Sequence, residues 1–385
     1  FTHANIFYVG RKLDNVASQD LTSSYPTVCI ADLFPMSKGK LVHPSSIEEF
    51  DKYVHKYCCI FDIKIYNLRN TFMNEAVISH NKCLEVINPV INNGRLESAD
   101  MINITLTEQD YFTYAQFYEW DEIEVGDMYI YRRGYLPEAV IKSILKFYTD
   151  KTVLKGLLDA DGHELDEYSQ AKAMLNSTYG MMVTDICRPE IIYDSGLWFT
   201  DDVDYDEALR KYNESKGRFL YFPWGVWVTA HARRNILKAI YAIGDDYVYS
   251  DTDSVKYLHP EKHTDFFTQY NDEIIEKLKK AMRYHGLPEA SISPCNQKGE
   301  AKPMGVFTYE GIYKHFKTLG AKRYMYTNDT GVHITVAGLG KKQGGEYIAT
   351  QEDPYEFFNN DMYIPPDHTG KLTHTYIDES MSGTA

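Results

Sequence analysis

The sequence lacks an uninterrupted apolar stretch long enough to cross a bilayer, so it does not predict a membrane protein. It also lacks a low-complexity tract that would indicate disorder, and an apolar content of 44% predicts a folded chain. The opening residues, Phe-Thr-His-Ala, are not those of a signal peptide, and the missing initial Met fits a chain cut from a longer one. We therefore expect a soluble, intracellular protein.

Cysteine is scarce, with six residues in the chain. They form no Cys-x-x-Cys pair and have no zinc-like spacing with histidine. Free, buried thiols in a reducing compartment are therefore expected.

Positive charge is also in short supply, since the formal net charge is −15. This excludes the broad basic surface of a protein that binds nucleic acid indiscriminately. The balance is uneven, however, because six lysines and arginines lie between residues 314 and 342 against one acid, Asp329. Such a basic segment fits one directed groove for a polyanion, although an ordinary solvated face has the same composition.

The chain has 385 residues, so several subdomains are expected. Residues 16–36 are predicted as a strand that enters a loop and is closed by Pro26, and 38–135 as a mostly β insertion. Alternating patterns predict strands at 58–66, 101–106, 128–131, 305–309, 323–327 and 332–336, and a hairpin at 247–258. Apolar spacing predicts helices that start after Leu136 with Pro137 in the first turn, and at 164–182, 226–242 and 265–285.

Asp251 and Asp253 lie two residues apart at the tip of the predicted hairpin and project to the same side. Two carboxylates that close repel each other unless a cation lies between them, and hard oxygen ligands favour Mg²⁺. An Asp-x-Asp pattern also occurs in glycosyltransferases that use nucleotide sugars, and on ordinary hairpin surfaces. The pair alone leaves the metal site and the simple surface turn equally open.

Asp20 ends a separate apolar strand, and Leu21 could add a backbone carbonyl to the same ion. Carboxylates from two strands suit a two-metal site, in which one ion activates an attacking 3′-hydroxyl and the other holds a triphosphate. Tyr25 would then lie beside the sugar, where its ring could exclude a ribose 2′-hydroxyl. The alternative for Tyr25 is a core aromatic residue before a proline.

Lys172, Asn176 and Tyr179 recur at helical spacing and form one stripe. Lys172 supplies positive charge for phosphates, and the other two residues would face a base pair. Lys151 and Lys155 on the preceding helix could complete a phosphate clamp, although long cationic side chains on helices are most often simply solvated.

Gly180 directly follows this stripe, and its missing side chain allows close approach of a template strand. Lys322 and Tyr324 precede an apolar strand inside the basic segment. Being two residues apart, they reach the same side and suit the terminal phosphates of a primer.

Taken together, these segments resemble motifs A, B, C and Lys-x-Tyr of family B DNA polymerases, in that order, and most closely those of the protein-primed viral enzymes. The resemblance runs from about Tyr8 to Lys342 and is carried by Asp20-x-x-Ser-x-Tyr-Pro, Lys172-x-x-x-Asn-Ser-x-Tyr-Gly, Tyr249-Ser-Asp-Thr-Asp-Ser and Lys322-x-Tyr. It implies an α+β right-hand polymerase fold, with an antiparallel palm sheet, helical-hairpin fingers, a small thumb and a β-rich insertion.

The resemblance also implies a division of the chain into parts. The linker and palm would be 1–37, the terminal-protein region 38–135 and the fingers 136–185. The second insertion would be 186–222, the rest of the palm 223–328, and the thumb with the C-terminal part 329–385. It implies DNA synthesis from dNTPs on a template-primer in viral replication, in the host cytoplasm and without a membrane. The cofactor would be two Mg²⁺ ions, with Mn²⁺ as an alternative, and a terminal protein could serve as the primer.

The residues carried over by the resemblance fall into four groups. The catalytic acids are Asp20, Asp251 and Asp253. The metal ligands are Asp20, Leu21 and Asp253. The nucleotide-binding residues are Leu21, Tyr25, Lys155, Lys172, Asn176 and Tyr179. The DNA-binding residues are Tyr8, Gly10, Gly180, Thr252, Lys322 and Tyr324.

Three features depart from the family pattern. Arg11 replaces the second glycine of the Tyr-x-Gly-Gly linker, and motif A has Leu-Thr-Ser-Ser where Asn-Ser-Leu is commoner. No segment before the linker could hold a 3′–5′ exonuclease, so no proofreading is expected from this chain. The polar tail after about Thr350 is expected to be a cut or disordered end of the thumb.

Two other functions stay open at this point. A truncated or split polymerase would bind DNA or a primer protein without turnover, and the acidic net charge fits this alternative. A metal-dependent glycosyltransferase would use the Asp-x-Asp but leaves the Lys172 stripe and Lys322-x-Tyr324 unexplained. A reverse transcriptase is disfavoured, because its hairpin places two acids side by side, whereas Thr252 intervenes here.

Overall fold

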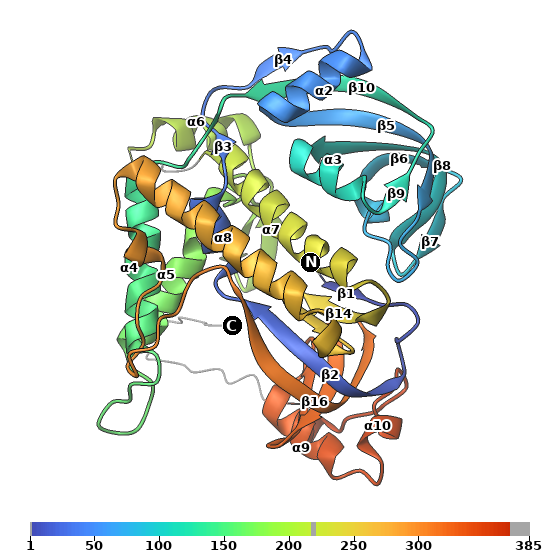
Figure 1. Cartoon of the computed structure of the whole chain (residues 1–385), viewed down its shortest axis with the longest axis vertical. Coiled ribbons are helices and arrows are strands. Elements are labelled where there is room, and N and C mark those ends of the chain that lie inside the picture. The colour runs from blue at the N-terminus through green and yellow to red at the C-terminus, as the bar shows by residue number, and fades with distance from the viewer. Residues whose placement is uncertain (1, 217–220, 370–385) are drawn as a thin grey trace.

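The computed structural model describes residues 2–216 and 221–369. Two separate sheets, each built from seven strands, lie on either side of the long helix α7, and a helical hairpin lies beside them (Figure 1). This mixed architecture confirms the predicted α+β fold class.

The first sheet carries the predicted motifs and has the strand order β1-β14-β15-β2-β16-β17-β18, with every described pair antiparallel. Its strands are β1 Thr2–Ala4, β14 Tyr247–Asp251, β15 Ser254–Tyr257, β2 Lys12–Leu21, β16 Phe307–Gly320, β17 Arg323–Asn328 and β18 Gly331–Val336. The expected hairpin at 247–258 is confirmed as β14 and β15. The strand expected at 305–309 is much longer, because β16 continues past Gly311 to Gly320.

Two long helices pack against this sheet, α7 Phe222–Ile243 and α8 Thr264–His285, and the short helix α1 Ser24–Ala31 packs against both of them. The prediction that Pro26 closes a strand is wrong, since Pro26 lies buried in the first turn of α1. A proline is tolerated there because the first N–H groups of a helix have no partner within the helix. Strand β2 therefore ends at Leu21, and the chain turns at once into a helix.

The second sheet lies within residues 40–131, in the region expected to be a β-rich insertion. Its order is β4-β10-β5-β8-β6, with β7 paired to β8 and β9 paired to β5. The elements are β4 Lys40–Val42, α2 Ile47–Lys56, β5 Cys58–Asn70, β6 Cys83–Ile87, β7 Val90–Asn92, β8 Arg95–Thr107, α3 Glu108–Tyr114, β9 Tyr118–Glu119 and β10 Glu122–Tyr131. A short pair, β3 Phe34–Pro35 with β11 Arg133–Gly134, connects it to the rest of the chain.

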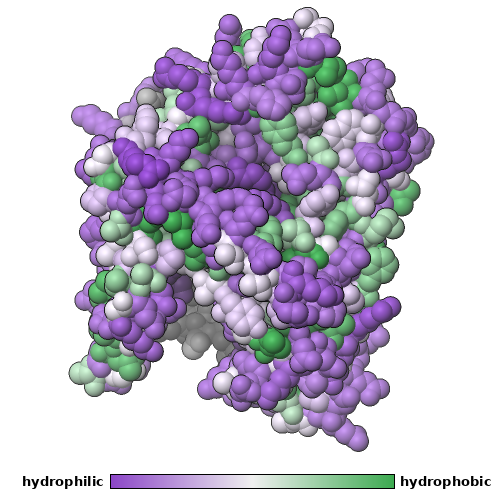
Figure 2. All heavy atoms as spheres, viewed as in Figure 1, coloured by the Kyte–Doolittle hydropathy of each residue, from purple (hydrophilic) through white to green (hydrophobic). Residues whose placement is uncertain are grey.

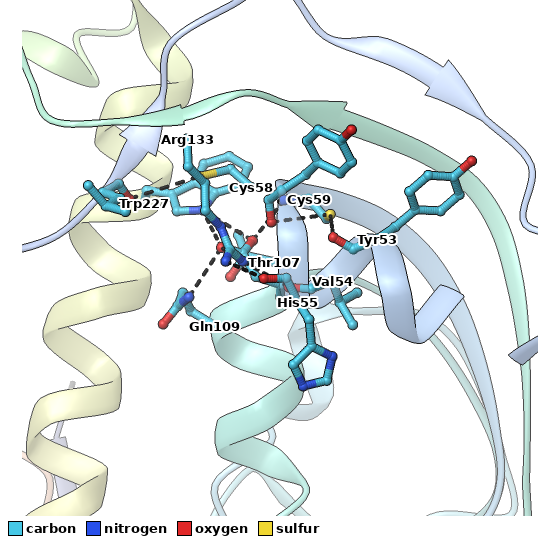
Figure 3. A network of polar contacts seen from close by, with 12 residues as sticks. Tyr53, Val54, His55, Cys58, Cys59, Thr107, Gln109, Arg133 and Trp227 are labelled. Carbon is cyan, nitrogen blue, oxygen red and sulfur yellow. Dashed lines mark hydrogen bonds and ion pairs between the residues drawn. The ribbon is translucent and has the colours of Figure 1, made fainter. Parts of the chain in front are cut away.

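Glu108, at the start of α3, ties this second sheet to α7. Its side chain is 1% exposed and accepts hydrogen bonds from the Cys59 N–H at 2.8 Å and from Trp227 Nε1 at 3.1 Å. Figure 3 shows Arg133, Gln109 and Trp227 converging at this point, and Arg133 lies 3.6 Å from the Glu108 carboxylate. Apolar residues from both sheets belong to one continuous buried cluster, and the first sheet has a second, smaller cluster around Tyr249 and Phe316.

The helical hairpin consists of α4 Glu138–Leu154 and α5 Asp166–Met182, close to the bounds expected. The Asp159 side chain accepts hydrogen bonds from the N–H groups of Asp161 and His163, so the segment between the helices is a turn, as predicted. Beyond α5 the chain forms a two-stranded hairpin, β12 Glu190–Asp194 with β13 Leu197–Asp201, and the helix α6 Tyr205–Glu214.

The last described residues form a small separate core around α9 Lys341–Ala349 and α10 Pro354–Phe357. Tyr355 and Phe358 are buried against Met325 of β17 and Ile334 of β18. The expectation of a disordered end after Thr350 is therefore wrong for residues 350–369, and residues 370–385 lie outside the described part.

Figure 2 shows that hydrophilic residues dominate the face turned to the viewer, and that the surface is hollowed between the α4–α5 hairpin and the α9 side. Among the helices of residues 2–216 and 221–369, none has the length and apolar character needed to cross a membrane.

Candidate active site

Asp20 and Asp253, here called the acid pair, meet where β2 ends beside the turn between β14 and β15. Asp20 lies opposite Ser254 in the antiparallel register. The Leu21 N–H donates to the carbonyl oxygen of Asp253 at 2.7 Å, which fixes the turn against the end of β2. Thr252 has φ 58°, in the left-handed region, and this tight turn places Asp253 beside the neighbouring strand.

The electrostatics of the acid pair reflect close negative charges in a partly buried place. Burial, together with the charges of Asp253 and Glu310, raises the pKa of Asp20 to about 7. Burial also raises the pKa of Asp253, and Asp251 adds to that effect. Such carboxylates are poised to gain free energy from any cation placed between them.

Asp251 is held differently from the acid pair. Lys322 Nζ lies 3.0 Å from both of its carboxylate oxygens, and the Thr2 hydroxyl donates to one of them at 3.1 Å. The backbone N–H of Lys322 donates to the Tyr249 hydroxyl, and the Tyr249 and Tyr324 rings lie 5.0 Å apart. The structure thus joins the Asp-x-Asp hairpin to the Lys322-x-Tyr324 segment through side-chain contacts.

Tyr25 and Tyr179 come from different elements and stack on each other, with ring centroids 4.7 Å apart. Tyr25 lies in the first turn of α1, directly after the strand that carries Asp20, and Tyr179 lies on the last turns of α5. Burial raises the pKa of both hydroxyls, and the positive charge of Arg233 on α7 opposes this rise. The pair forms an aromatic wall next to the acid pair.

Three lysines of the helical hairpin, Lys151, Lys155 and Lys172, form a second feature that we call the lysine cluster. Lys151 donates to the Ser23 hydroxyl at 3.1 Å. Burial lowers the pKa of Lys151. The positive charges of Lys155 and Lys172 lower the pKa of Lys151 further, whereas the negative charges of Asp20 and Asp253 oppose this shift. Lys151 therefore lies in the electrostatic field of the acid pair, with Lys155 and Lys172 close behind it.

The remaining predicted residues are placed as follows. Asn176 is exposed on α5, and a side chain at Gly180 would meet nothing within 4 Å, so both border open space. The side chain of Leu21 is in the core, which leaves only its backbone for a ligand role. Gly10 has φ 79° and its N–H donates to the carbonyl of Thr318, while the Tyr8 hydroxyl donates to that of Asp245, so this linker is bound to the end of β16 and to the turn before β14.

Three charged residues near the site were not predicted: Arg233, Lys256 and Glu310. Arg233 extends from α7 towards both tyrosines, and its Nε donates to Asp110 at 2.7 Å. Lys256 and Glu310 lie beside Asp20 on neighbouring strands. Lys256 had a recognisable signal, since it is a lone cation between the apolar residues Val255 and Tyr257, two positions beyond Ser254 on the same face.

A groove of about 760 Å³ leads away from the acid pair. It is lined by Asp20, Lys256 and Tyr324 at one end and by Lys341 and Lys342 of α9 at the other. Part of the basic segment recognised in the sequence therefore lines a groove that begins at the acids.

The donor set at the acid pair suits a hard divalent cation such as Mg²⁺, because it consists of carboxylate oxygens that mutual repulsion holds ready. Within the described ranges, no three His, Cys, Asp or Glu side chains converge closely enough to hold an ion. Asp251 is turned to Lys322, so two carboxylates and backbone oxygen are the ligands that the chain itself could offer.

Comparison with known proteins identifies the fold as the right-hand fold of DNA polymerases. Phi29 DNA polymerase, solved with primer-template DNA and incoming nucleotides, superposes with a TM-score of 0.64 at 18% identity, covering 89% of this chain and 54% of that one. An orthorhombic crystal form of the same enzyme gives a TM-score of 0.61 at 17% identity, covering 93% and 56%. The resemblance to the protein-primed family B polymerases is thus confirmed at the level of the fold.

Among curated proteins, the DNA polymerase of Streptococcus phage Cp-1 is 22% identical over 271 residues, covering 66% of this chain and 41% of that protein. No family model matches the chain. The chain spans about half the length of the polymerases it resembles.

Proposed function

We propose that this chain catalyses template-directed DNA synthesis, transferring deoxynucleoside monophosphates from dNTPs to a primer 3′-hydroxyl. The observation that carries the proposal is the meeting of the acid pair, the stacked tyrosines and the lysine cluster, which come from three separate parts of the chain. This combination has a place for a metal-bound triphosphate. A glycosyltransferase would not need the aromatic wall or the basic groove, and the fold favours the polymerase hypothesis.

Each group has a distinct part in this proposal. The lysine cluster binds the triphosphate. The charges of Lys155 and Lys172 repel that of Lys151, and a bound anion would relieve this repulsion. Tyr25 and Tyr179 bound the sugar and base, and Asn176 with Gly180 borders the templating base. Lys322 and Tyr324 hold the primer end, and Tyr8, Gly10 and Thr252 contact DNA nearby.

The metal ligands would be Asp20, Asp253 and the Leu21 carbonyl. Two bound Mg²⁺ ions, or Mn²⁺, would lower the pKa of the attacking hydroxyl and neutralise the leaving pyrophosphate. The chain's own contribution is to hold two carboxylates together through the Leu21–Asp253 backbone hydrogen bond. Asp251 supports them by fixing Lys322.

A primer-extension assay tests the proposal. The wild-type chain should extend a primer on a DNA template in the presence of Mg²⁺, and Asp253→Ala should lose at least about 10³-fold of the rate, since it removes a ligand of the ion. Asp100→Ala, at an exposed acid on β8, is the matched control and should keep the wild-type rate. Equal extension by the wild type and Asp253→Ala would refute the assignment.

A second candidate is a polymerase part that binds DNA or a primer protein without turnover. It is favoured by the acidic net charge of −15, which is unusual for a chain that grips DNA during synthesis. Binding of a labelled primer-template with no incorporation in either Mg²⁺ or Mn²⁺ would select this candidate over the first.

A further inference from the structure

Lys256 occupies an unusual position for a lysine, inside the sheet and next to the acid pair. On β15 it lies directly opposite Ser18 of β2, while Ser254 lies opposite Asp20. Residues two apart on a strand share a face, so Lys256 projects to the same side as Asp20, one step further along the ladder. Its side chain is buried, with 4% exposed.

The contacts of Lys256 keep its ammonium group in place. Nζ donates to the Ser18 hydroxyl at 2.7 Å, and that hydroxyl donates to Glu310 at 2.8 Å. Lys256 itself lies 3.9 Å from the Glu310 carboxylate. Glu310 sits in an irregularity of β16 between Tyr309 and Gly311, where Gly311 has φ 110°, and a bulge of this kind redirects a side chain.

Burying an ammonium group is costly unless it is matched by negative charge. Burial lowers the pKa of Lys256, and the nearby acids Glu310, Asp20, Asp253 and Asp251 oppose this shift. The coupling is mutual, because Lys256 also opposes the rise in the pKa of Asp20 and of Asp253. Lys256 therefore stands in the field of the acids that would bind the ion.

We propose that Lys256 is a resident counter-cation of the acid pair: it offsets part of the negative charge of Asp20 and Asp253 when no divalent cation is bound, and it weakens their affinity for a free divalent cation. This positioning role rests on the proposed function for the identity of the ligand. The negative charge of a triphosphate outweighs one ammonium group, so the site takes up its ions together with the nucleotide and resists filling beforehand.

The test is calorimetric titration of the folded chain with MnCl₂ in the absence of DNA and nucleotide. Lys256→Met removes the charge at similar volume and should bind Mn²⁺ at least about tenfold more tightly than the wild type, a change of about 1.4 kcal/mol. Lys64→Met removes a strand lysine that pairs with Glu124 at 3.8 Å on the second sheet, and should leave the affinity unchanged. An affinity of Lys256→Met within twofold of the wild type, or weaker, overturns the inference.

Two more variants guard against a merely structural effect. Lys256→Gln removes the same charge with a polar side chain and should tighten Mn²⁺ binding as much as Lys256→Met. Adding Glu310→Gln to Lys256→Met restores the net charge of the cluster and should return the affinity to within about threefold of the wild type. A double variant that binds as tightly as Lys256→Met would show that charge is not the cause.

The same titration separates this inference from the proposed function. Asp253→Ala should abolish Mn²⁺ binding, and if it does while Lys256→Met binds like the wild type, only the counter-cation role fails. If Asp253→Ala binds Mn²⁺ as the wild type does, the acid pair is not the metal site and both fail.

Discussion

Glu75 provides a measurable consequence of how strand β1 is packed beside β14. It lies in the segment after β5, is 2% exposed, and its carboxylate is 3.4 Å from His3 Nδ1 on β1. His3 is paired in register with Ser250, next to Asp251. Burial raises the pKa of Glu75 to about 8 and lowers that of His3, so the pair is uncharged at neutral pH.

The predicted effect of Glu75→Gln follows from proton linkage. The folded chain keeps a proton on Glu75 that the unfolded chain releases near pH 4.5, so the wild type loses stability as the pH rises from about 4.5 to about 8. Each unit of that window is worth about 1.4 kcal/mol. Glutamine has no proton to lose. The free energy of unfolding of the variant, relative to that of the wild type, should therefore rise by up to about 1.4 kcal/mol per pH unit and level off above pH 8.

The assay is urea unfolding of the wild type and Glu75→Gln at unit steps from pH 5 to pH 9, followed by tryptophan fluorescence. Glu85→Gln, at an exposed position of β6, controls for the loss of one carboxylate. A difference in the free energy of unfolding that stays constant over this range would mean that Glu75 is ionised in the folded chain, and would refute the reasoning.

Three further predictions concern other buried or clustered charges. Glu108→Ala should lower the free energy of unfolding by about 3–5 kcal/mol, because it leaves several buried donors without an acceptor, and a loss below about 1 kcal/mol in urea unfolding would contradict this. Burial alone would raise the pKa of Asp32, but Arg234 at 3.1 Å holds this pKa well below its usual range. The Asp32–Arg234 pair therefore stabilises the fold above about pH 4, and this stabilisation is lost as the pH falls further. Asp32→Asn should therefore cost about 2–4 kcal/mol at pH 7 and clearly less at pH 3, and an equal cost at both would contradict the assignment. Lys151→Gln should raise the KM for dNTPs at least about tenfold with a smaller change in kcat, and steady-state kinetics with an unchanged KM would remove Lys151 from the triphosphate site.

The start of α4 and both ends of α8 were predictable because their signals are local. Pro137 precedes α4, and α8 has apolar residues at helical spacing with a glycine after His285, so these positions were found within a residue or two, whereas the short helices α1, α2 and α3 were not predicted. Pro26 misled because Ser-Ser-Tyr-Pro fits both a strand end and the first turn of a helix, and packing of α1 against α7 and α8 decides between them. The length of β16 was missed because Glu310-Gly311 looks like a strand end, whereas it is an irregularity inside a longer strand.

The positions of the candidate acids at a strand end and a tight turn were predictable because their spacing within each motif is local. Their cationic neighbours were not, since the positions of Lys256 and Arg233 depend on cross-strand register and on helix packing between distant segments. The contact of Lys322 with Asp251 spans 71 residues and likewise follows from the order of strands in the sheet.

The junction at Glu108 has a consequence for how the molecule opens. Trp227, Arg233 and Arg234 all bond to α3, so one face of α7 is completed by the second sheet. That sheet is not a detachable module: excising residues 38–135 would uncover one face of α7 and remove the α3 acceptors of Trp227, Arg233 and Arg234. Amide hydrogens of α7 and of the central strands β5 and β8 should exchange with solvent in a single cooperative event, with the same free energy of opening.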